Sequence, residues 1–346
     1  MYRFKWAARF WSGGCQIKKF VVITSINPPR FEKLKLFTDA DYEVVIVGDR
    51  KTDEAAWNIA IEKVHFLSYK AQEDISLELS NLIGPNSYAR KNFGYIFALR
   101  LGADVILDTD DDTFFRDSVN CPIEFIKNAS WFEYKAEETF NPYQFFAYGE
   151  RMWPRGYPLR EIVNNLNNGK PELRQTTNSQ VDILQFLVSG DPDVDAIFRL
   201  TVSPEPKLFG VSHELVNLGK DSYVPANTQA AFWINRAGFE FLYIPRNVAF
   251  RFCDILKMFV AQSTLTLAYG GFLFEQIRND HDLIKDFESE VDVYLKTELT
   301  IQTLREHKMK NIEDCYISLS QVGVVPEDEV KIATLFASLM NEYINR

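Results

Sequence analysis

VILDTDDDTFF, residues 105–115, begins with three aliphatic residues and continues with four aspartates in five positions. The aliphatic residues are typical of a short buried strand. The aspartates that follow them are Asp108, Asp110, Asp111 and Asp112. Carboxylates this close repel one another strongly unless a positive charge lies among them. The stretch therefore predicts a strand that ends in a cation-binding loop.

Other short apolar runs precede this one, at residues 18–26, 42–49 and 64–68, with a helical pattern at 88–103. Strands that are nearly all apolar and alternate with helices predict an α/β fold with a mostly parallel central sheet, covered on both faces. Ligands of such sheets bind beyond the carboxyl ends of the strands. At those ends this chain places polar residues: Thr24, Ser25, Asn27, Gly48, Asp49, Arg50 and the aspartate run.

The spacing of the aspartates indicates which of them act together. In an extended segment alternate side chains share a face, so we expect Asp108, Asp110 and Asp112 to point together and Asp111 to point away. Oxygen ligands in this arrangement suit Mg²⁺ or Mn²⁺, which leave positions open for phosphate oxygens. A solvated acidic loop is the alternative interpretation.

The predicted helix at 88–103 supplies the complement to these carboxylates. Free N–H groups and the helix dipole favour an anion at its first turns, which hold Arg90, Lys91 and Asn92. A diphosphate between the start of this helix and the metal would bind to both of them. The simpler interpretation of these residues is an exposed basic turn. An aspartyl-phosphate phosphatase of the haloacid dehalogenase type is disfavoured, because the fourth residue after Asp108 is aspartate and not threonine or valine.

Composition excludes several other classes. The 346 residues are 46% hydrophobic and carry a net charge of −10, which argues against a general nucleic-acid-binding protein. Four cysteines without a CxxC pair argue against a zinc cluster or a disulfide framework and favour a reducing compartment. We find no signal peptide, and the apolar stretch 255–274 contains Lys257 and Gln262, which favours a buried helix over a membrane span. We therefore expect a cytoplasmic chain with no transmembrane segment.

Six motifs, occurring in the order of the family, resemble the STELLO-type (DUF288) glycosyltransferases over most of residues 20–300. They are VIVGDRKT (45–52), SYARKNFGYIFAL (87–99), ERMWPRGYPL (150–159), GDPDVDAIFRLT (190–201), FRFCDILKMFVAQ (250–262) and RNDHDLIKDFESEVDVYLKT (278–297). Through RGYPLRE and the acidic run, the chain is more distantly similar to the reversibly glycosylated polypeptides, which are UDP-arabinopyranose mutases.

The resemblance implies a GT-A (Rossmann-like) nucleotide-sugar-binding fold with C-terminal helices. It also implies metal-dependent sugar transfer, with Mn²⁺ or Mg²⁺, from a nucleotide sugar, here expected to be UDP-linked. The acceptor would be a glycan, glycoconjugate or protein. We expect an N-terminal extension at 1–17, a GT-A domain at 18–290 and a C-terminal helical segment at 291–346. Within the GT-A domain, 18–112 would form the nucleotide-sugar half and 113–290 the acceptor half. Eukaryotic members carry a Golgi membrane anchor. This chain is expected to begin almost at the catalytic domain, so we do not infer a Golgi location from the resemblance.

The resemblance also implies roles for residues of the nucleotide half. The metal ligands would be Asp110, Asp112 and, late in the chain, His281. Asp108 would share the metal or bind the ribose, and the motif alone leaves the choice of DxD frame open. The remaining nucleotide contacts would come from Thr24, Ser25, Asp49, Arg90 and Asn92.

In the acceptor half, Asp254 of FRFCDIL is expected between an apolar strand and a helix, as the general base or as a helix N-cap. Asp193 and Asp195 would bind the sugar or acceptor, or act in turn and capping contacts. Arg155 matches the arginine that becomes glycosylated in the mutases. Since a guanidinium stays protonated, a clamp on phosphate or carboxylate is its other interpretation. The alternative functions are therefore a mutase or self-glycosylating protein, and an inactive scaffold that binds nucleotide sugars.

Overall fold

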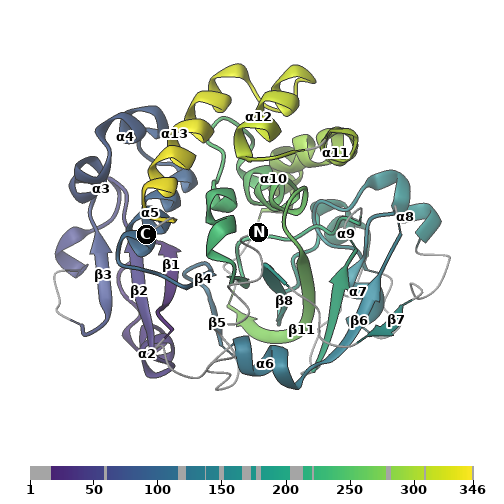
Figure 1. Ribbon diagram of the computed structural model, residues 1–346, viewed down its shortest axis with the longest axis horizontal. Coiled ribbons are helices and arrows are strands. Elements are labelled where there is room, and N and C mark those ends of the chain that lie inside the picture. The colour runs from purple at the N-terminus through teal and green to yellow at the C-terminus, as the bar shows by residue number, and fades with distance from the viewer. Residues whose placement is uncertain are drawn as a thin grey trace.

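The computed structural model describes residues 17–57, 61–115, 122–136, 138–147, 152–165, 173–176, 181–202, 213–219, 222–277, 282–307 and 309–344. Within these ranges the chain is an α/β protein built on one large sheet of eleven strands (Figure 1). Its path runs β3-β2-β1-β4-β10-β8-β11-β9-β6-β7, and β5 pairs with β11 beside this path. The α/β class and the C-terminal helices are confirmed, and the arrangement is consistent with a Rossmann-like GT-A fold.

The first half of the sheet is parallel, as the apolar runs predicted. It consists of β1 (Lys19–Thr24), β2 (Tyr42–Val47), β3 (Val64–Leu67) and β4 (Val105–Asp108). The segments between these strands are α2 (Phe31–Asp39), η1 (Glu54–Trp57), α3 (Tyr69–Ile75), α4 (Leu77–Ile83), η2 (Tyr88–Arg90) and α5 (Lys91–Arg100). Because β1, β2 and β4 run in the same direction, their carboxyl ends meet at one edge of the sheet.

The second half of the sheet is mixed. Its strands are β5 (Thr113–Phe115), β6 (Ser130–Tyr134), β7 (Arg174–Thr176), β8 (Ile183–Ser189), β9 (Glu214–Leu218), β10 (Ala231–Trp233) and β11 (Leu267–Gln276). The short strand β10 joins the halves, since it pairs antiparallel with both β4 and β8. Its helices are α6 (Pro122–Asn128), α7 (Pro142–Phe146), α8 (Leu159–Asn165), α9 (Ala196–Thr201), η3 (Arg236–Leu242) and α10 (Phe250–Gln262).

The strand alternation in β1 divides the core between the two faces of the sheet. Val22 packs with Phe93 of α5 on one face, and Val21 packs with Phe37 of α2 on the other. Helix α5 lies very close to the strands. The glycine at position 94 permits this approach, since a Cβ there would come within 2.5 Å of a Val22 methyl group. This close contact fixes the start of α5 over the sheet edge where the aspartates lie.

Three C-terminal helices, α11 (Leu283–Glu306), α12 (Ile312–Gln321) and α13 (Glu327–Ile344), pack on the same side as α5 and α10 (Figure 1). The buried carboxylate of Glu329 on α13 accepts hydrogen bonds from the N–H groups of Arg246 and Asn247. The C-terminal helices thereby hold the chain just before α10. Helix α11 runs across the boundary expected at residue 290, and the proposed domain division stays a prediction.

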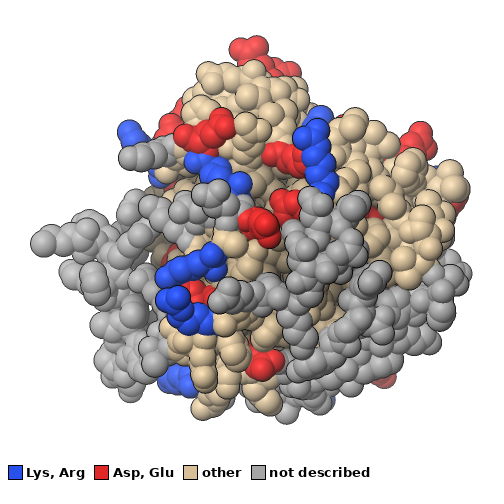
Figure 2. All heavy atoms as spheres, turned by 90° about the vertical axis from the view of Figure 1, so that its right-hand side faces the viewer, with Lys and Arg blue, Asp and Glu red and all other residues tan. Residues whose placement is uncertain are grey.

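The apolar stretch 255–274 is only partly the buried helix that we expected. Its first part completes α10 and its last part forms most of β11, which is buried in the middle of the sheet. Among the described residues, no helix combines the length and the hydropathy needed to cross a membrane. On the face drawn in Figure 2, basic and acidic side chains of the described residues are interspersed.

Candidate functional site

A cavity of about 430 Å³ opens beyond the carboxyl ends of β1, β2 and β4. Its volume lies in the range of pockets that hold small ligands. Six residues that the sequence assigned to nucleotide or metal line it: Thr24, Ser25, Asp49, Arg90, Asp110 and Asp112. The convergence of polar residues expected at the strand ends is therefore present.

Asp49 and Arg90 form the wall on the β2 side of the cavity. Asp49 accepts hydrogen bonds from the N–H groups of Arg50 (2.6 Å) and Ser87 (3.0 Å), so it joins the end of β2 to the start of η2. The guanidinium of Arg90 donates to Gln72 (2.6 Å) and stacks over the ring of Tyr69 at 3.8 Å. Arg90 is thus fixed by protein contacts and is almost fully buried, although it reaches the cavity.

The alternation predicted that Asp111 points away from the site, but in the structure its side chain lines the cavity. Strand β4 ends at Asp108 and a turn follows, so the period of two does not continue through the aspartates. Asp111 accepts hydrogen bonds from the Ser25 hydroxyl (2.6 Å) and the Asn27 amide (2.9 Å). It joins the acidic turn to the end of β1 and lines the cavity.

Asp110 and Asp112 stand next to each other at the edge of the cavity. The Oδ1 atom of Asp110 accepts from the Tyr88 hydroxyl (2.6 Å) and from the Lys91 ammonium (3.2 Å). Its Oδ2 atom makes no hydrogen bond with any described residue. Asp112 accepts from the Gln276 side-chain amide at 3.1 Å. Burial, together with the charge of Asp112, raises the pKa of Asp110 to about 6.

This donor set fits a cation that is shared with a phosphorylated ligand, rather than a metal enclosed by protein. The described residues contain no group of three or more His, Cys, Asp and Glu side chains placed to hold a metal. Mg²⁺ commonly binds through one or two carboxylates and completes its shell with water and substrate phosphates. Asp110 and Asp112 can supply the two carboxylates; His281 lies outside the described residues.

Asp108 and Asn92 do not line the cavity, because both side chains are fully buried and held inside the protein. Asp108 forms ion pairs with Lys91 (2.8 Å) and Lys257, and it accepts a hydrogen bond from Tyr95 (2.8 Å). The side-chain amide of Asn92 makes two hydrogen bonds with the backbone of Ile244, donating to its carbonyl and accepting from its N–H. In this structure both residues organise the fold around the cavity.

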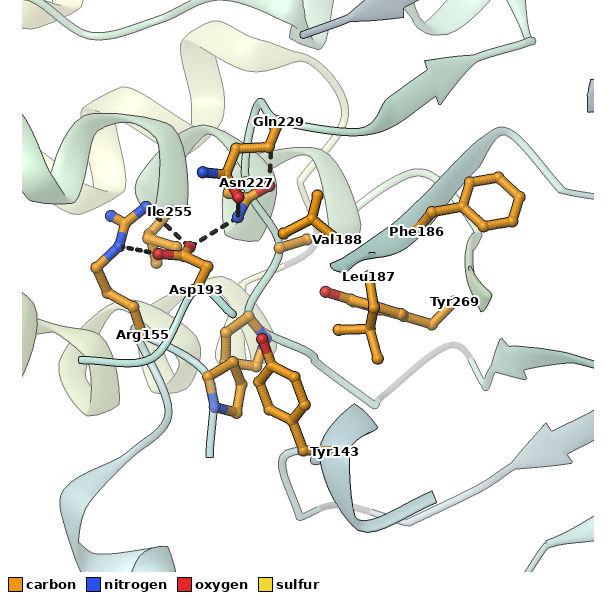
Figure 3. Close-up of a pocket in the computed structure, with 13 residues that line it drawn as sticks. Tyr143, Arg155, Phe186, Leu187, Val188, Asp193, Asn227, Gln229, Ile255 and Tyr269 are labelled. Carbon is orange, nitrogen blue, oxygen red and sulfur yellow. Dashed lines mark hydrogen bonds and ion pairs between the residues drawn. The ribbon is translucent and has the colours of Figure 1, made fainter. Parts of the chain in front are cut away.

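In the second half of the sheet and its helices, the guanidinium of Arg155 lies between Asp193 and Asp254. Its Nη2 atom is 2.8 Å from Asp254 and 3.0 Å from Asp193. Asn227 also donates to Asp193, at 2.7 Å, and Figure 3 shows Asp193 between Arg155 and Asn227. Burial opposes the charged form, but the two carboxylates raise the pKa of Arg155 well above its usual value. Arg155 is thus paired with two carboxylates of the protein itself, and its expected role in binding a phosphate or carboxylate of a ligand stays a prediction. A guanidinium held in this way is a poor nucleophile.

Asp254 lies inside α10, and not before it as the sequence suggested; the N-cap position is Ala249. Asp254 therefore follows Phe250 by about one helical turn, which puts both on one face of α10. Phe250 lines the cavity and is 66% exposed, so this face of α10 is directed toward it. Asp195, by contrast, caps α9, accepting from the Phe198 N–H at 2.8 Å. Burial raises the pKa of Asp195 to about 6.

Sequence reasoning missed the roles of Tyr88, Lys91 and Lys257. Lys91 had been counted among the residues that favour an anion, and Lys257 only as a charge in an apolar stretch. The one available signal was the position of Lys257 in an otherwise apolar run, since buried lysines are almost always paired. Asp108, the partner that Lys91 and Lys257 share, lies 149 residues before Lys257 and could not be inferred from spacing.

Fold and cavity together define a Rossmann-like α/β protein with a cavity beyond its strand ends. Over 91% of its length the chain is similar to two proteins of Arabidopsis thaliana. They are "Probable glycosyltransferase STELLO2", 26% identical over 340 residues, and "Probable glycosyltransferase STELLO1", 25% identical over 342. These matches confirm the resemblance to the STELLO-type family. The chain spans 43% of the length of either relative. No family model matches the chain.

The contacts of Asp108 and Asp110 predict effects of very different size on stability. Asp108→Asn leaves Lys91 and Lys257 without their shared counter-ion inside the protein, which should cost about 3–5 kcal/mol of unfolding free energy. Asp110→Asn removes a partly exposed carboxylate whose neighbour Asp112 repels it, and should change stability by less than about 1 kcal/mol. Denaturant unfolding in EDTA measures both. Equal losses would show that Asp108 is not the anchor of this cluster.

Proposed function

We propose that this chain is a metal-dependent glycosyltransferase domain that uses a nucleotide sugar, with UDP as the expected nucleotide. The proposal rests on one observation above all: the cavity at the strand ends is bordered by Asp110 and Asp112, and the Oδ2 atom of Asp110 makes no hydrogen bond with any residue in the described part of the chain. The similarity to two proteins named probable glycosyltransferases supports the same reaction class.

The proposed donor lies across the cavity, with its nucleoside toward the ends of β1 and β2 and its diphosphate toward the acidic turn. Thr24, Ser25 and Asp49 border the nucleoside end. Asp110 and Asp112 would hold Mn²⁺ or Mg²⁺, which neutralises the negative charge that develops on the departing diphosphate. Lys51 also lines the cavity and adds a positive charge at its rim.

Asp254 is our candidate for the base that removes the proton of the acceptor hydroxyl. It lies one helical turn after Phe250 on α10, and both of its oxygens are oriented by the guanidinium of Arg155 at 3.0 and 2.8 Å. A carboxylate fixed in this way is positioned for proton transfer without a search through rotamers. Arg155 would then be a positioning residue, and Asp193 its second anchor.

The donor proposal predicts a stabilisation that depends on metal and nucleotide together. The melting temperature is measured against a panel of nucleotide sugars, each with Mn²⁺ and with EDTA. At a ligand concentration of 100 times Kd, binding should add about 2.7 kcal/mol of stability. We expect one UDP-sugar to raise the melting temperature with Mn²⁺ and to lose this effect in EDTA.

Asp110→Ala should abolish the metal-dependent part of this shift. Asp74→Ala is the matched control, because Asp74 is an exposed aspartate on α3 that pairs only with Lys70 among the described residues. Stabilisation of the Asp110 variant equal to that of the wild type would refute the metal assignment. A folded wild-type protein that responds to no donor would favour the scaffold alternative.

The base proposal predicts that Asp254→Asn loses turnover but keeps donor binding. Proton transfer by a positioned group contributes about 10²- to 10⁴-fold to a rate. The assay is release of UDP from the donor identified above, with water or an added acceptor. Asp193→Asn is the matched control, since it removes a carboxylate from the same guanidinium. Equal rates for the two variants would argue against a base at Asp254.

A further inference from the structure

A fully buried cluster of charges lies directly behind the acidic turn. Lys91 is on α5, Asp108 ends β4 and Lys257 is on α10, and all three side chains are inaccessible to solvent. The Oδ1 atom of Asp108 pairs with the Lys91 ammonium, and the Oδ2 atom pairs with the Lys257 ammonium. The Tyr95 hydroxyl also donates to Oδ1. Buried charges of this kind are tolerated only when they are paired and hydrogen-bonded.

Lys91 differs from Lys257 because it also reaches the candidate cation site. Its ammonium contacts Asp108 at 2.8 Å and Asp110 at 3.2 Å, and it donates to the Thr109 carbonyl at 2.6 Å. Lys257 contacts Asp108 but has no contact with Asp110. One buried positive charge is therefore shared between the structural aspartate and an aspartate at the edge of the cavity.

The two buried lysines neutralise only two of the four aspartates in this region. Lys91 and Lys257 together neutralise Asp108 and Asp110, whereas the contacts described for Asp111 and Asp112 come from uncharged donors. A divalent cation entering beside Asp110 and Asp112 meets the attraction of these carboxylates and the repulsion of Lys91 at close range. Burial keeps water and salt from screening that repulsion.

We propose that Lys91 is an internal competitor of the divalent cation for Asp110. The site then binds the free cation weakly and fills only when the cation arrives with the diphosphate of the donor, whose negative charge offsets that of Lys91. Lys91 is a positioning residue in this account, because it does not line the cavity and acts through Asp110. This inference rests on the cation site of the proposed function and specifies how that site is regulated.

The test is the affinity of the nucleotide-free, chelator-treated protein for Mn²⁺, measured by titration with electron paramagnetic resonance of the free ion. Lys91→Gln removes the charge but leaves Lys257 paired with Asp108, so the buried interior stays balanced. Removing one unscreened positive charge beside a divalent ion should tighten Mn²⁺ binding by about tenfold or more. A merely structural role for Lys91 predicts unchanged or weaker binding.

Lys51→Gln is the matched control, since it makes the same change of charge at the exposed rim of the same cavity. Its effect should stay below about threefold, because solvent screens an exposed charge. Addition of UDP should tighten Mn²⁺ binding more in the wild type than in Lys91→Gln, since the diphosphate offsets a charge that the variant lacks.

Lys257→Gln is a second variant that keeps the inference testable if Lys91→Gln does not fold. Without Lys257, the ammonium of Lys91 is drawn to Asp108 and away from Asp110, so Mn²⁺ binding should again become tighter, by a smaller factor. Mn²⁺ affinity that is unchanged or lower in the lysine variants, or raised equally in Lys51→Gln, overturns the inference. Failure of the proposed function is separate, since it appears as a wild type that no donor stabilises.

Discussion

The ion pairs of Asp108 with Lys91 and Lys257 are the interaction on which the site depends. They join the end of β4 to α5 on one side and to α10 on the other, inside the protein. These three elements carry the acidic turn, the start of the predicted anion-binding helix and the face with Phe250 and Asp254. Because an isolated buried charge is so costly, the three elements are held in one arrangement.

Around this anchor the four aspartates of one turn have different tasks. Asp108 is structural, Asp111 ties the turn to the end of β1, and Asp110 and Asp112 face the cavity. Four equivalent carboxylates would repel one another, and the fold avoids this by giving each its own partners. The same division selects Asp110 and Asp112 as the frame for the proposed cation.

The sequence predicted the structure of residues 18–112 far better than that of residues 113–290. Strands β1 to β4 were predicted because each is a short, mostly apolar run, and the cavity followed from the polar residues at their ends. The outward direction expected of Asp111 was wrong, because alternation holds only while the strand continues. The strand expected before Asp254 was wrong because residues 250–262 are apolar enough for either structure, and tertiary packing made them α10. The partners of Asp108 are distant in sequence, so no local pattern could reveal them.

The central claim is that Asp110 and Asp112 hold a cation that bridges the protein to a nucleotide diphosphate. The most direct measurement is crystallographic: crystals grown with UDP and Mn²⁺, with data collected at the manganese absorption edge. The account predicts one anomalous peak between the carboxylates of Asp110 and Asp112 and in contact with the diphosphate, with Asp108 still paired to both lysines. A nucleotide bound in this cavity without a peak there, or a peak at another group of ligands, would contradict it.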